Sequence, residues 1–164
     1  MILFWDKNLP KTIPEALRRV KPPIGFEIYL ENFPLSDKYP EGGDDPWLAK
    51  VGLRGWIVIT QDWHMHKRVN ELFAIKQHGM GVFYLWGSEE PKWEIMKCFI
   101  RGYDRMIKAI DTTPRPFIYE VSRTGILSSV ALPKLLTHGE ILAYSDLQRV
   151  ELKDAKAEEQ SINQ

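Results

Sequence analysis

Short apolar runs alternate with segments of helical periodicity, and this alternation restricts the fold more than any other feature of the sequence. Apolar runs of this length, bounded by turn residues, are typical of buried strands. They lie at residues 2–5, 26–30, 56–60 and 82–86, and a closing pair at 116–122 and 126–132 flanks the turn "RTG". Alternating strands and helices favour a mostly parallel sheet with helices on both faces. We therefore predict an α/β protein, a three-layer α/β/α sandwich with a C-terminal antiparallel β-hairpin.

The helical segments carry recognisable ends. Thr12, followed by Glu15, resembles a capping box at the start of the first helix. Asp45 is a good N-cap for the next helix, and Gly79 is expected to end the one after it. Ser88 is the expected cap of the longest helix, where Glu89 and Glu90 would face the positive end of the helix dipole. The expected buried positions are Ala16, Leu17 and Val20 on the first helix and Trp93, Met96, Ile100, Tyr103, Ile107 and Ile110 on the longest.

The composition excludes several classes of protein. With 44% hydrophobic and 27% charged residues over 164 positions, the chain has the composition of one globular domain. Its 22 basic and 22 acidic residues balance, so binding to a nucleic acid would require a local basic surface. The single cysteine excludes an internal disulfide and a multi-cysteine zinc site.

The two ends of the sequence complete this outline. The opening "MILFWDKNLP" lacks the features of a secretory leader, and no apolar run approaches the roughly 20 residues that a membrane span needs. We therefore expect a cytoplasmic protein that does not enter a membrane. Residues 1–152 are predicted to form one domain, and residues 153–164, which have almost nothing to bury, a disordered tail.

Acidic residues follow or precede the predicted strands where a ligand site is expected. Asp6 ends the first strand, Asp62 follows the third, and Asp44 and Asp45 begin the helix that leads into the third. Ligands bind at the carboxyl ends of the strands in open α/β sheets, so these acids converge if the first and third strands are neighbours. Carboxylates gathered in this way repel one another unless they surround a hard cation, and their oxygens suit Mg²⁺ or Mn²⁺. Such a site is typical of phosphodiester hydrolysis, and Asn8 is a candidate to orient a bound ligand.

Ordinary structural roles remain open for the same acids. Asp45 is equally well explained as an N-cap, and Asp6 and Asp62 could each serve the turn that follows their strand. Basic residues lie next to them, with Lys7 beside Asp6, and Lys67 and Arg68 just beyond Asp62. Those three are candidates for binding substrate phosphates, with simple solvation as the alternative.

The stretch "WHMH" after Asp62 also carries alternatives. His64 and His66 form an H-x-H pair, which would suit zinc or copper, but no third soft ligand has a suitable spacing and Cys98 is expected in the core. Contact with substrate or simple exposure of the two histidines is the better reading. Trp63 is the one indole in this region expected outside the core, whereas Trp93 is expected inside it, so Trp63 is a candidate to stack on a base.

The order of three motifs resembles the PIN-like nucleases, especially a branch near the VapC-type toxins of toxin–antitoxin systems. These motifs are "ILFWDKNLP", "GGDDPWLAKVGLRGWIVITQD" and "KRVNELFAIKQHGMGVFYL", and the late "PFIYEVSRTGILSSV" resembles the closing hairpin of that branch. The resemblance implies a PIN fold and a Mg²⁺- or Mn²⁺-dependent ribonuclease that often pairs with an antitoxin and forms a homodimer. Matched by position, its acids are Asp6, Asp44 or Asp45, Asp62, and Glu71 in "VNELF". The chain departs from many relatives at "WHMHKR", where they carry another acid or a basic run.

We therefore predict a metal-dependent endoribonuclease, the toxin of a type II toxin–antitoxin system. Asp6, Asp62 and one of Asp44 or Asp45 would hold the ion. The alternative is a catalytically weak or inactive PIN-like module that binds RNA or a protein. A phosphotransfer domain of the receiver or haloacid dehalogenase type is disfavoured, because no D-x-D-x-T follows the first strand and "VFYLWGSEE" offers no lysine.

Overall fold

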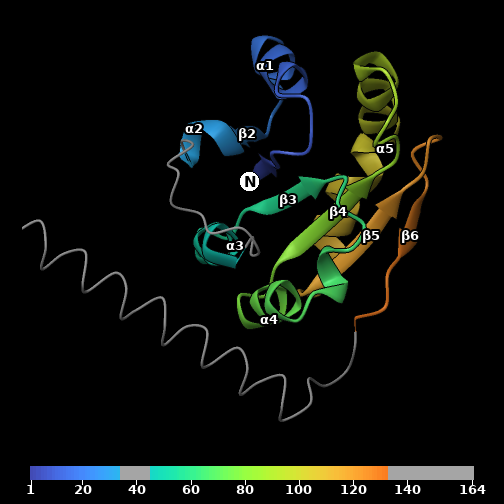
Figure 1. Ribbon diagram of the computed structural model, residues 1–164. Coiled ribbons are helices and arrows are strands. Elements are labelled where there is room, and N and C mark those ends of the chain that lie inside the picture. The colour runs from blue at the N-terminus through green and yellow to red at the C-terminus, as the bar shows by residue number, and fades with distance from the viewer. Residues whose placement is uncertain (34–44, 133–164) are drawn as a thin grey trace, which may run out of the picture. The chain divides into compact units, whose positions relative to one another are not determined.

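A parallel sheet with one antiparallel edge strand is the centre of the structure, a computed structural model that describes residues 1–33 and 45–132 (Figure 1). In this part of the chain the sheet has six strands in the order β2-β1-β3-β4-β5-β6. The strands are β1 (Ile2–Trp5), β2 (Gly25–Ile28), β3 (Ile57–Thr60), β4 (Gly81–Leu85), β5 (Phe117–Val121) and β6 (Leu127–Ser129). All neighbours are parallel except β5 and β6, which form the predicted closing hairpin.

Helices cover both faces of this sheet, which confirms the predicted three-layer α/β/α sandwich (Figure 1). One face carries α1 (Thr12–Arg19) and α5 (Lys92–Thr112). The other carries α2 (Tyr29–Asn32), α3 (Asp45–Leu53), the short 3₁₀ helix η1 (Met65–Lys67) and α4 (Val69–Gln77). Successive strand residues point to opposite faces, so Leu3 and Trp5 pack under α1 and α5 whereas Phe4 packs under α3.

Aromatic side chains fill both layers between sheet and helices. Trp5 meets Phe99 of α5 edge to face, with ring centroids 5.4 Å apart. On the opposite face Phe4 stacks on Trp47 of α3 at 5.3 Å. Each fully buried side chain of this size contributes about 1.5–3 kcal/mol through removal of apolar surface from water. The central strands β1, β3 and β4 are buried on both faces, which explains why they appear in the sequence as continuous apolar runs.

The first helix differs from its predicted capping and inner face. Lys11, not Thr12, occupies the N-cap position, and no side chain caps the helix end. The buried residues are Ile13, Pro14 and Leu17, whereas Ala16 and Val20 are exposed. Val20 lies beyond the last turn of α1, so it cannot extend the buried stripe. The capping-box prediction and two of the three predicted inner positions were therefore wrong.

The longest helix begins later than predicted. It starts at Lys92, with Pro91 in the N-cap position. Ser88 and the two glutamates after it therefore belong to the preceding loop, where the Glu90 N–H donates to the Gly87 carbonyl at 3.0 Å. The proline explains the delayed start, because it favours an extended conformation for the residue before it.

The buried face of α5 is also rotated from the predicted one. Trp93 is 63% exposed and Ile100 is exposed, so neither belongs to the core. The other predicted residues of this face are partly buried against the core, namely Met96, Tyr103, Ile107 and Ile110. The buried residues of this helix are Ile95, Cys98, Phe99, Gly102, Met106 and Ala109. A Cβ at Gly102 would lie 2.8 Å from Val121 Cγ1, so the helix approaches the sheet along its glycine. This close approach sets the rotation and turns Trp93 outward.

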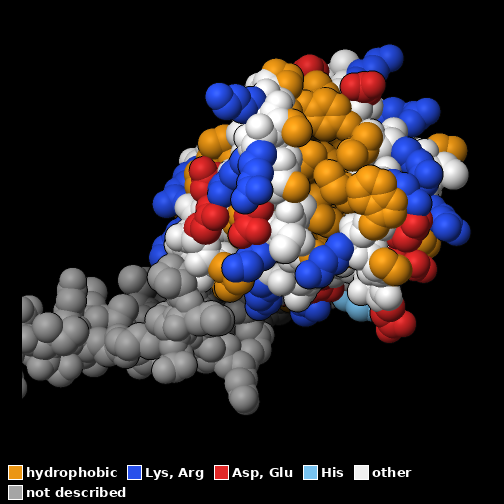
Figure 2. Space-filling model, turned by 90° about the horizontal axis from the view of Figure 1, so that it is seen from above, with side chains coloured by type: hydrophobic (Ala, Val, Ile, Leu, Met, Phe, Trp, Pro, Cys, Tyr) orange, Lys and Arg blue, Asp and Glu red, His pale blue; other side chains and the backbone are white. Residues whose placement is uncertain are grey.

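Hydrophobic side chains remain exposed on the α1 and α5 face of the molecule (Figure 2). They border a shallow groove of about 320 Å³ that runs between the two helices. Its lining comprises Leu17, Pro22, Phe26, Phe99, Ile100, Tyr103 and Asp104.

None of the helices within residues 1–33 and 45–132 combines the length and the apolar character that a membrane crossing requires. The predicted domain end at 152 and the predicted tail at 153–164 lie outside the described residues.

Candidate functional site

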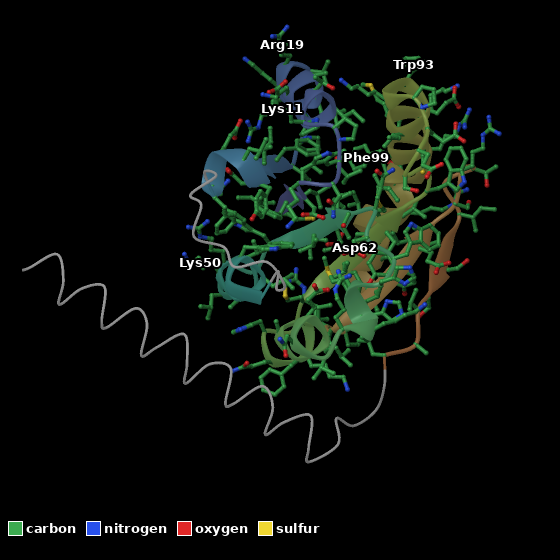
Figure 3. The ribbon with its side chains drawn as sticks, in the orientation of Figure 1. Lys11, Arg19, Lys50, Asp62, Trp93 and Phe99 are labelled. Atoms are coloured by element: carbon green, nitrogen blue, oxygen red, sulfur yellow. The ribbon has the colours of Figure 1, made fainter. Side chains whose placement is uncertain are left out.

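Asp6 and Asp62 lie at the same edge of the sheet because β1 and β3 are parallel neighbours. Trp5 is in register with Ile59, so Asp6 comes opposite Thr60. The Asp6 N–H continues the ladder with a 3.0 Å hydrogen bond to the Ile59 carbonyl. Asp62, labelled in Figure 3, follows β3, and Trp63 and Met65 beyond it pack in the same layer as α3 and α4. This is the carboxyl edge, where ligands bind in sheets of this type.

The Asp6 carboxylate is buried and held by three donors. Asp6 is only 1% exposed. Oδ1 accepts the Lys7 N–H at 2.6 Å, and Oδ2 accepts Asn8 Nδ2 at 3.2 Å and the Thr60 hydroxyl at 2.7 Å. A buried carboxylate needs such donors to offset the loss of water. Asp6 is therefore fixed in orientation at the end of its strand.

Thr60 connects Asp6 to Asp62. Its fully buried hydroxyl donates to Asp6 Oδ2 and accepts the Asp62 N–H at 3.0 Å. Asp62 Oδ1 then accepts the His64 N–H at 3.1 Å, in the manner of an Asx-turn. Met65, the first residue of η1, is fully buried and anchors this loop in the core. The two acids are thus joined through one threonine side chain.

Arg68 connects Asp62 to Glu71. Its Nη2 donates to Asp62 Oδ2, and its Nε donates to Glu71 Oε1 at 2.7 Å. Glu71 lies in the first turn of α4 and is only 3% exposed. Burial lowers the pKa of Arg68, but the hydrogen bonds to Glu71 and Asp62 outweigh it and raise the net value, so the guanidinium stays charged. A continuous network therefore runs from Asp6 through Thr60, Asp62 and Arg68 to Glu71.

The remaining predicted site residues lie around this network at different depths. The Lys7 ammonium lies 5.7 Å from the ring centroid of Tyr29, and Asn8 binds Asp6. His64 and Lys67 are exposed. Asp45 begins α3, but its side chain is not described, and Asp44 lies outside the described residues.

His66 and Trp63 pack around Tyr84, a buried residue of β4 beside Thr60 in the sheet. The Tyr84 hydroxyl accepts the His66 N–H at 3.2 Å and lies 2.9 Å from His66 Nδ1. Burial raises the pKa of Tyr84, assisted by the charges of Asp62 and Glu71, so its hydroxyl stays protonated. Trp63 stacks on the same ring, with centroids 6.3 Å apart.

The donor set has the chemistry of a hard-cation site but is incomplete among the located side chains. Across residues 1–33 and 45–132, no three His, Cys, Asp or Glu side chains gather as metal ligands. Asp6 and Asp62 supply carboxylate oxygens of the kind that Mg²⁺ and Mn²⁺ prefer. A third acid from Asp44 or Asp45 would come from the segment whose side chains are not described. By their chemistry, the two located acids could supply part of the ligand set of such an ion.

Sequence reasoning missed Thr60 and Tyr84, the polar side chains that organise the edge. Both sit inside apolar strands, where they read as part of a buried run. The strand register brings them to the edge, because Thr60, Tyr84 and Glu120 occupy matching positions on β3, β4 and β5. Asp6, directly after β1, continues the same row. Side chains at matching positions point to the same face, so a polar row crosses the carboxyl end of the sheet.

Comparison with known families matches the part of the chain that builds this edge. The family is described as PIN like domain, and the match spans residues 1–87. Those residues include Asp6, Thr60, Asp62, Arg68 and Glu71. Neither curated proteins nor solved structures gave a significant match. Since the match extends over more than half of the 164 residues, the chain belongs to the PIN-like domain family.

Proposed function

We propose that this protein is a Mg²⁺- or Mn²⁺-dependent endoribonuclease whose reaction takes place at the Asp6–Asp62 edge. The observation that carries the proposal is the Thr60 hydroxyl, which bonds Asp6 and the Asp62 backbone at the carboxyl ends of neighbouring strands. Membership of the PIN-like family supports nuclease activity, because these two acids lie within the matched region. A buried carboxylate beside a second acid is an arrangement that a divalent ion would stabilise.

Each residue of the edge has a distinct role in this proposal. Asp6, Asp62 and one of Asp44 or Asp45 would hold the ion, and Thr60 keeps Asp6 in position. The ion, when bound, would lower the pKa of a water molecule and offset negative charge at phosphorus. Arg68 orients Asp62 and screens Glu71 from it.

Substrate binding is assigned to the exposed residues that follow Asp62. Lys67 is exposed on η1, where its ammonium can reach a phosphate. Arg68 is held by two carboxylates, so its contact with a phosphate would be shared with them. Lys7, Asn8, His64 and Trp63 border the same edge and complete the proposed contact surface for RNA.

The test is cleavage of RNA by the full chain with Mg²⁺ or Mn²⁺, and again with EDTA. We expect metal-dependent cleavage that Asp6→Asn and Asp62→Asn each lower at least about 100-fold, since even outer residues of metal sites cost 10–100-fold. Asp111→Asn, an exposed acid at the far end of α5, is the charge-matched control and should keep wild-type activity. Equal activity in all four proteins, or cleavage that survives EDTA, would refute the proposal.

A toxin role is the finer part of this proposal. It predicts that expression of the wild-type chain arrests growth, and that a co-expressed antitoxin protein relieves the arrest. The Asp6→Asn variant should not arrest growth at a matched expression level. A homodimer is a further expectation, tested by the mass of the purified chain in solution.

An RNA-binding or protein-binding module without catalysis is the second candidate. The observation that favours it is Arg68, which already neutralises two of the predicted acids, Asp62 and Glu71. Calorimetric titration with Mn²⁺ separates the two candidates. A nuclease should bind the ion in a manner that Asp6→Asn abolishes, whereas an inactive module should bind none and still retain RNA or protein binding.

A further inference from the structure

A second cavity lies next to Asp62 and is lined by two indoles. It has a volume of about 250 Å³, and its walls are Trp63, Trp86, Gly87, Ser88, Glu89 and Glu90. Trp63 directly follows Asp62, and Trp86 directly follows β4, the neighbour of β3. The cavity is therefore at the same carboxyl edge as the acids but beyond them along the sheet.

Both indoles are supported from within the protein. Trp63 stacks on the buried Tyr84 ring. The Arg123 guanidinium lies 5.2 Å from the ring centroid of Trp86. The backbone N–H of Trp86 donates to the Val121 carbonyl at 3.0 Å. Both residues are only half-buried, so each combines a fixed position with an accessible surface. Rigid aromatic surfaces of this kind bind flat rings by stacking.

A tight turn brings two carboxylates to the same cavity. Gly87 has φ +102°, a conformation that favours glycine, and a Cβ there would lie 3.3 Å from Glu90 Cβ and Cγ. The Glu90 N–H closes the turn by donating to the Gly87 carbonyl at 3.0 Å. Glu89 and Glu90 are exposed and both line the cavity. Their carboxylates can therefore accept hydrogen bonds from a ligand that stacks on an indole.

These walls select among flat ligands. Guanine presents two adjacent N–H donors, N1–H and the 2-amino group, which match the two oxygens of one carboxylate. Adenine offers an amino group beside an acceptor nitrogen, and cytosine offers one donor group, so neither can pair with a carboxylate in two places. The carboxylates of Glu89 and Glu90 disfavour a phosphate inside the cavity.

We propose that this cavity binds a guanine base of the RNA substrate and thereby sets where the chain is cut. The inference rests on the proposed ribonuclease function, because it places the base beside the Asp6–Asp62 edge. The base stacks on Trp63 or Trp86 and donates to Glu89 or Glu90, while its phosphate points out of the cavity toward solvent.

The first test measures nucleotide binding without metal and without cleavage. Guanosine, inosine, adenosine and cytidine monophosphates are titrated into the full chain by calorimetry. We expect the guanosine nucleotide to bind about tenfold or more tightly than the adenosine and cytidine nucleotides, because one bidentate pair discriminates by that order. Inosine monophosphate, which lacks the 2-amino group, should lie between them.

Variants assign this preference to the cavity. The double change Glu89→Gln with Glu90→Gln should remove the preference for guanosine, and Trp86→Phe should weaken all nucleotides that bind there. Asp111→Asn and Trp93→Phe change an acid and an indole that do not line the cavity, so both should bind as wild type. Thermal unfolding shows whether each variant is folded. Equal binding of all four nucleotides, or a preference that survives the double change, would overturn the proposal.

The second test maps the cut sites in RNA, and it separates this inference from the function on which it rests. We expect metal-dependent cuts next to guanines, and loss of that preference in the double variant. Metal-dependent cuts without base preference would overturn the cavity proposal and leave the ribonuclease intact. Guanosine binding without any cleavage would refute the ribonuclease and retain the cavity as a nucleotide site, which contradicts its proposed role in setting the cut.

Discussion

Two arginines of this protein bind carboxylates in different surroundings. Arg18 of α1 binds both oxygens of Glu31 at 2.8 Å, and Arg68 binds Asp62 and Glu71. The exposed fractions of the two arginine side chains are similar, 34% and 45%. Their partners differ far more, because the Glu31 side chain is 48% exposed and that of Glu71 is 3% exposed. The burial of the carboxylate, more than that of the arginine, separates a surface pair from a structural one.

The two pairs also serve different parts of the fold. Arg18 joins α1 to β2 and α2, since its Nε and Nη2 also donate to the Phe26 carbonyl at 2.9 and 2.6 Å. Arg68 joins the loop after β3 to the first turn of α4, next to the proposed reaction edge. The hydrogen bond from Arg18 lowers the pKa of Glu31. At the edge, the arginine instead keeps a buried acid paired while Asp62 faces the site.

Removal of Arg68 should have the largest effect on stability. Arg68→Ala leaves the Glu71 carboxylate buried without its arginine, a loss that costs about 3–5 kcal/mol in a fully buried pair. Because the arginine itself is partly exposed, we expect a smaller loss of about 1–3 kcal/mol in the free energy of unfolding. Urea denaturation measures it, and Lys67→Ala, an exposed neighbour, should stay within about 0.5 kcal/mol of wild type.

A second change identifies the source of that loss. If it comes from the uncompensated charge of Glu71, adding Glu71→Gln to Arg68→Ala should recover part of the stability. No recovery, or a loss in Arg68→Ala no larger than that in Lys67→Ala, would show that the buried Glu71 carboxylate is not the source of the effect.

The architecture was predictable because it depends on patterns that repeat along the chain. Strands β1 to β4 and the closing hairpin of β5 and β6 are short apolar runs, and a three-layer arrangement buries the central strands on both faces. The convergence of Asp6 and Asp62 was predicted only on the condition that β1 and β3 are neighbours, which the structure confirms. The rotation of α5 was not predictable, because it depends on one contact between Gly102 and Val121 that leaves no periodic signal.

The edge itself was predictable only in outline. Asp6 and Asp62 are found from their places after strands, but the position of a threonine hydroxyl between them depends on the register of two strands distant in sequence. The partners of Arg68 depend in turn on how η1 turns the chain between β3 and α4. The sequence predicts a helix that begins after Ser88, whereas the structure has a turn there and begins the helix at Lys92, so the second cavity has no counterpart in the sequence pattern.

Loss of the Thr60 hydroxyl should weaken the edge without the larger cost of a lost charge. Thr60→Val keeps the shape but removes the donor to Asp6, and we expect Mn²⁺ affinity and RNA cleavage to fall about 10–100-fold, as for other residues that orient metal ligands. Thr60→Ser retains the hydroxyl and should stay closer to wild type. A Val variant as active as the Ser variant would show that the acids do not depend on this link.

Removal of Arg18 should cost about 1 kcal/mol, less than removal of Arg68, because its carboxylate partner is solvated in the absence of the pair. Arg18→Ala loses the bonds to Glu31 and to the Phe26 carbonyl. In 1 M NaCl, where the screening length is about 3 Å, the ionic part of that loss should shrink. The loss in Arg68→Ala should change less with salt, and the opposite order would contradict the role of carboxylate burial.

The smallest expected effect is a pH dependence that extends the comparison from the arginines to His66, which borders the same edge. Burial, followed by the charge of Lys67, lowers the pKa of His66 below its ordinary value of 6.5. The unfolded chain therefore binds this proton more readily than the folded protein. The contribution of neutral His66 to stability is complete above the pKa of this residue in the unfolded chain. It is lost as the pH falls through the pKa of His66 in the folded protein.

The Nδ1 atom of His66 lies 2.9 Å from the Tyr84 hydroxyl, which ties the ring to the buried edge. We expect urea denaturation to show lower stability at pH 5 than at pH 7.5, with a shallower dependence in His66→Gln. His64→Gln, which changes an exposed histidine of the same loop, should keep the wild-type slope. Stability that rises as the pH falls from 7.5 to 5, or a slope carried by His64, would place the sensitive group outside the buried edge.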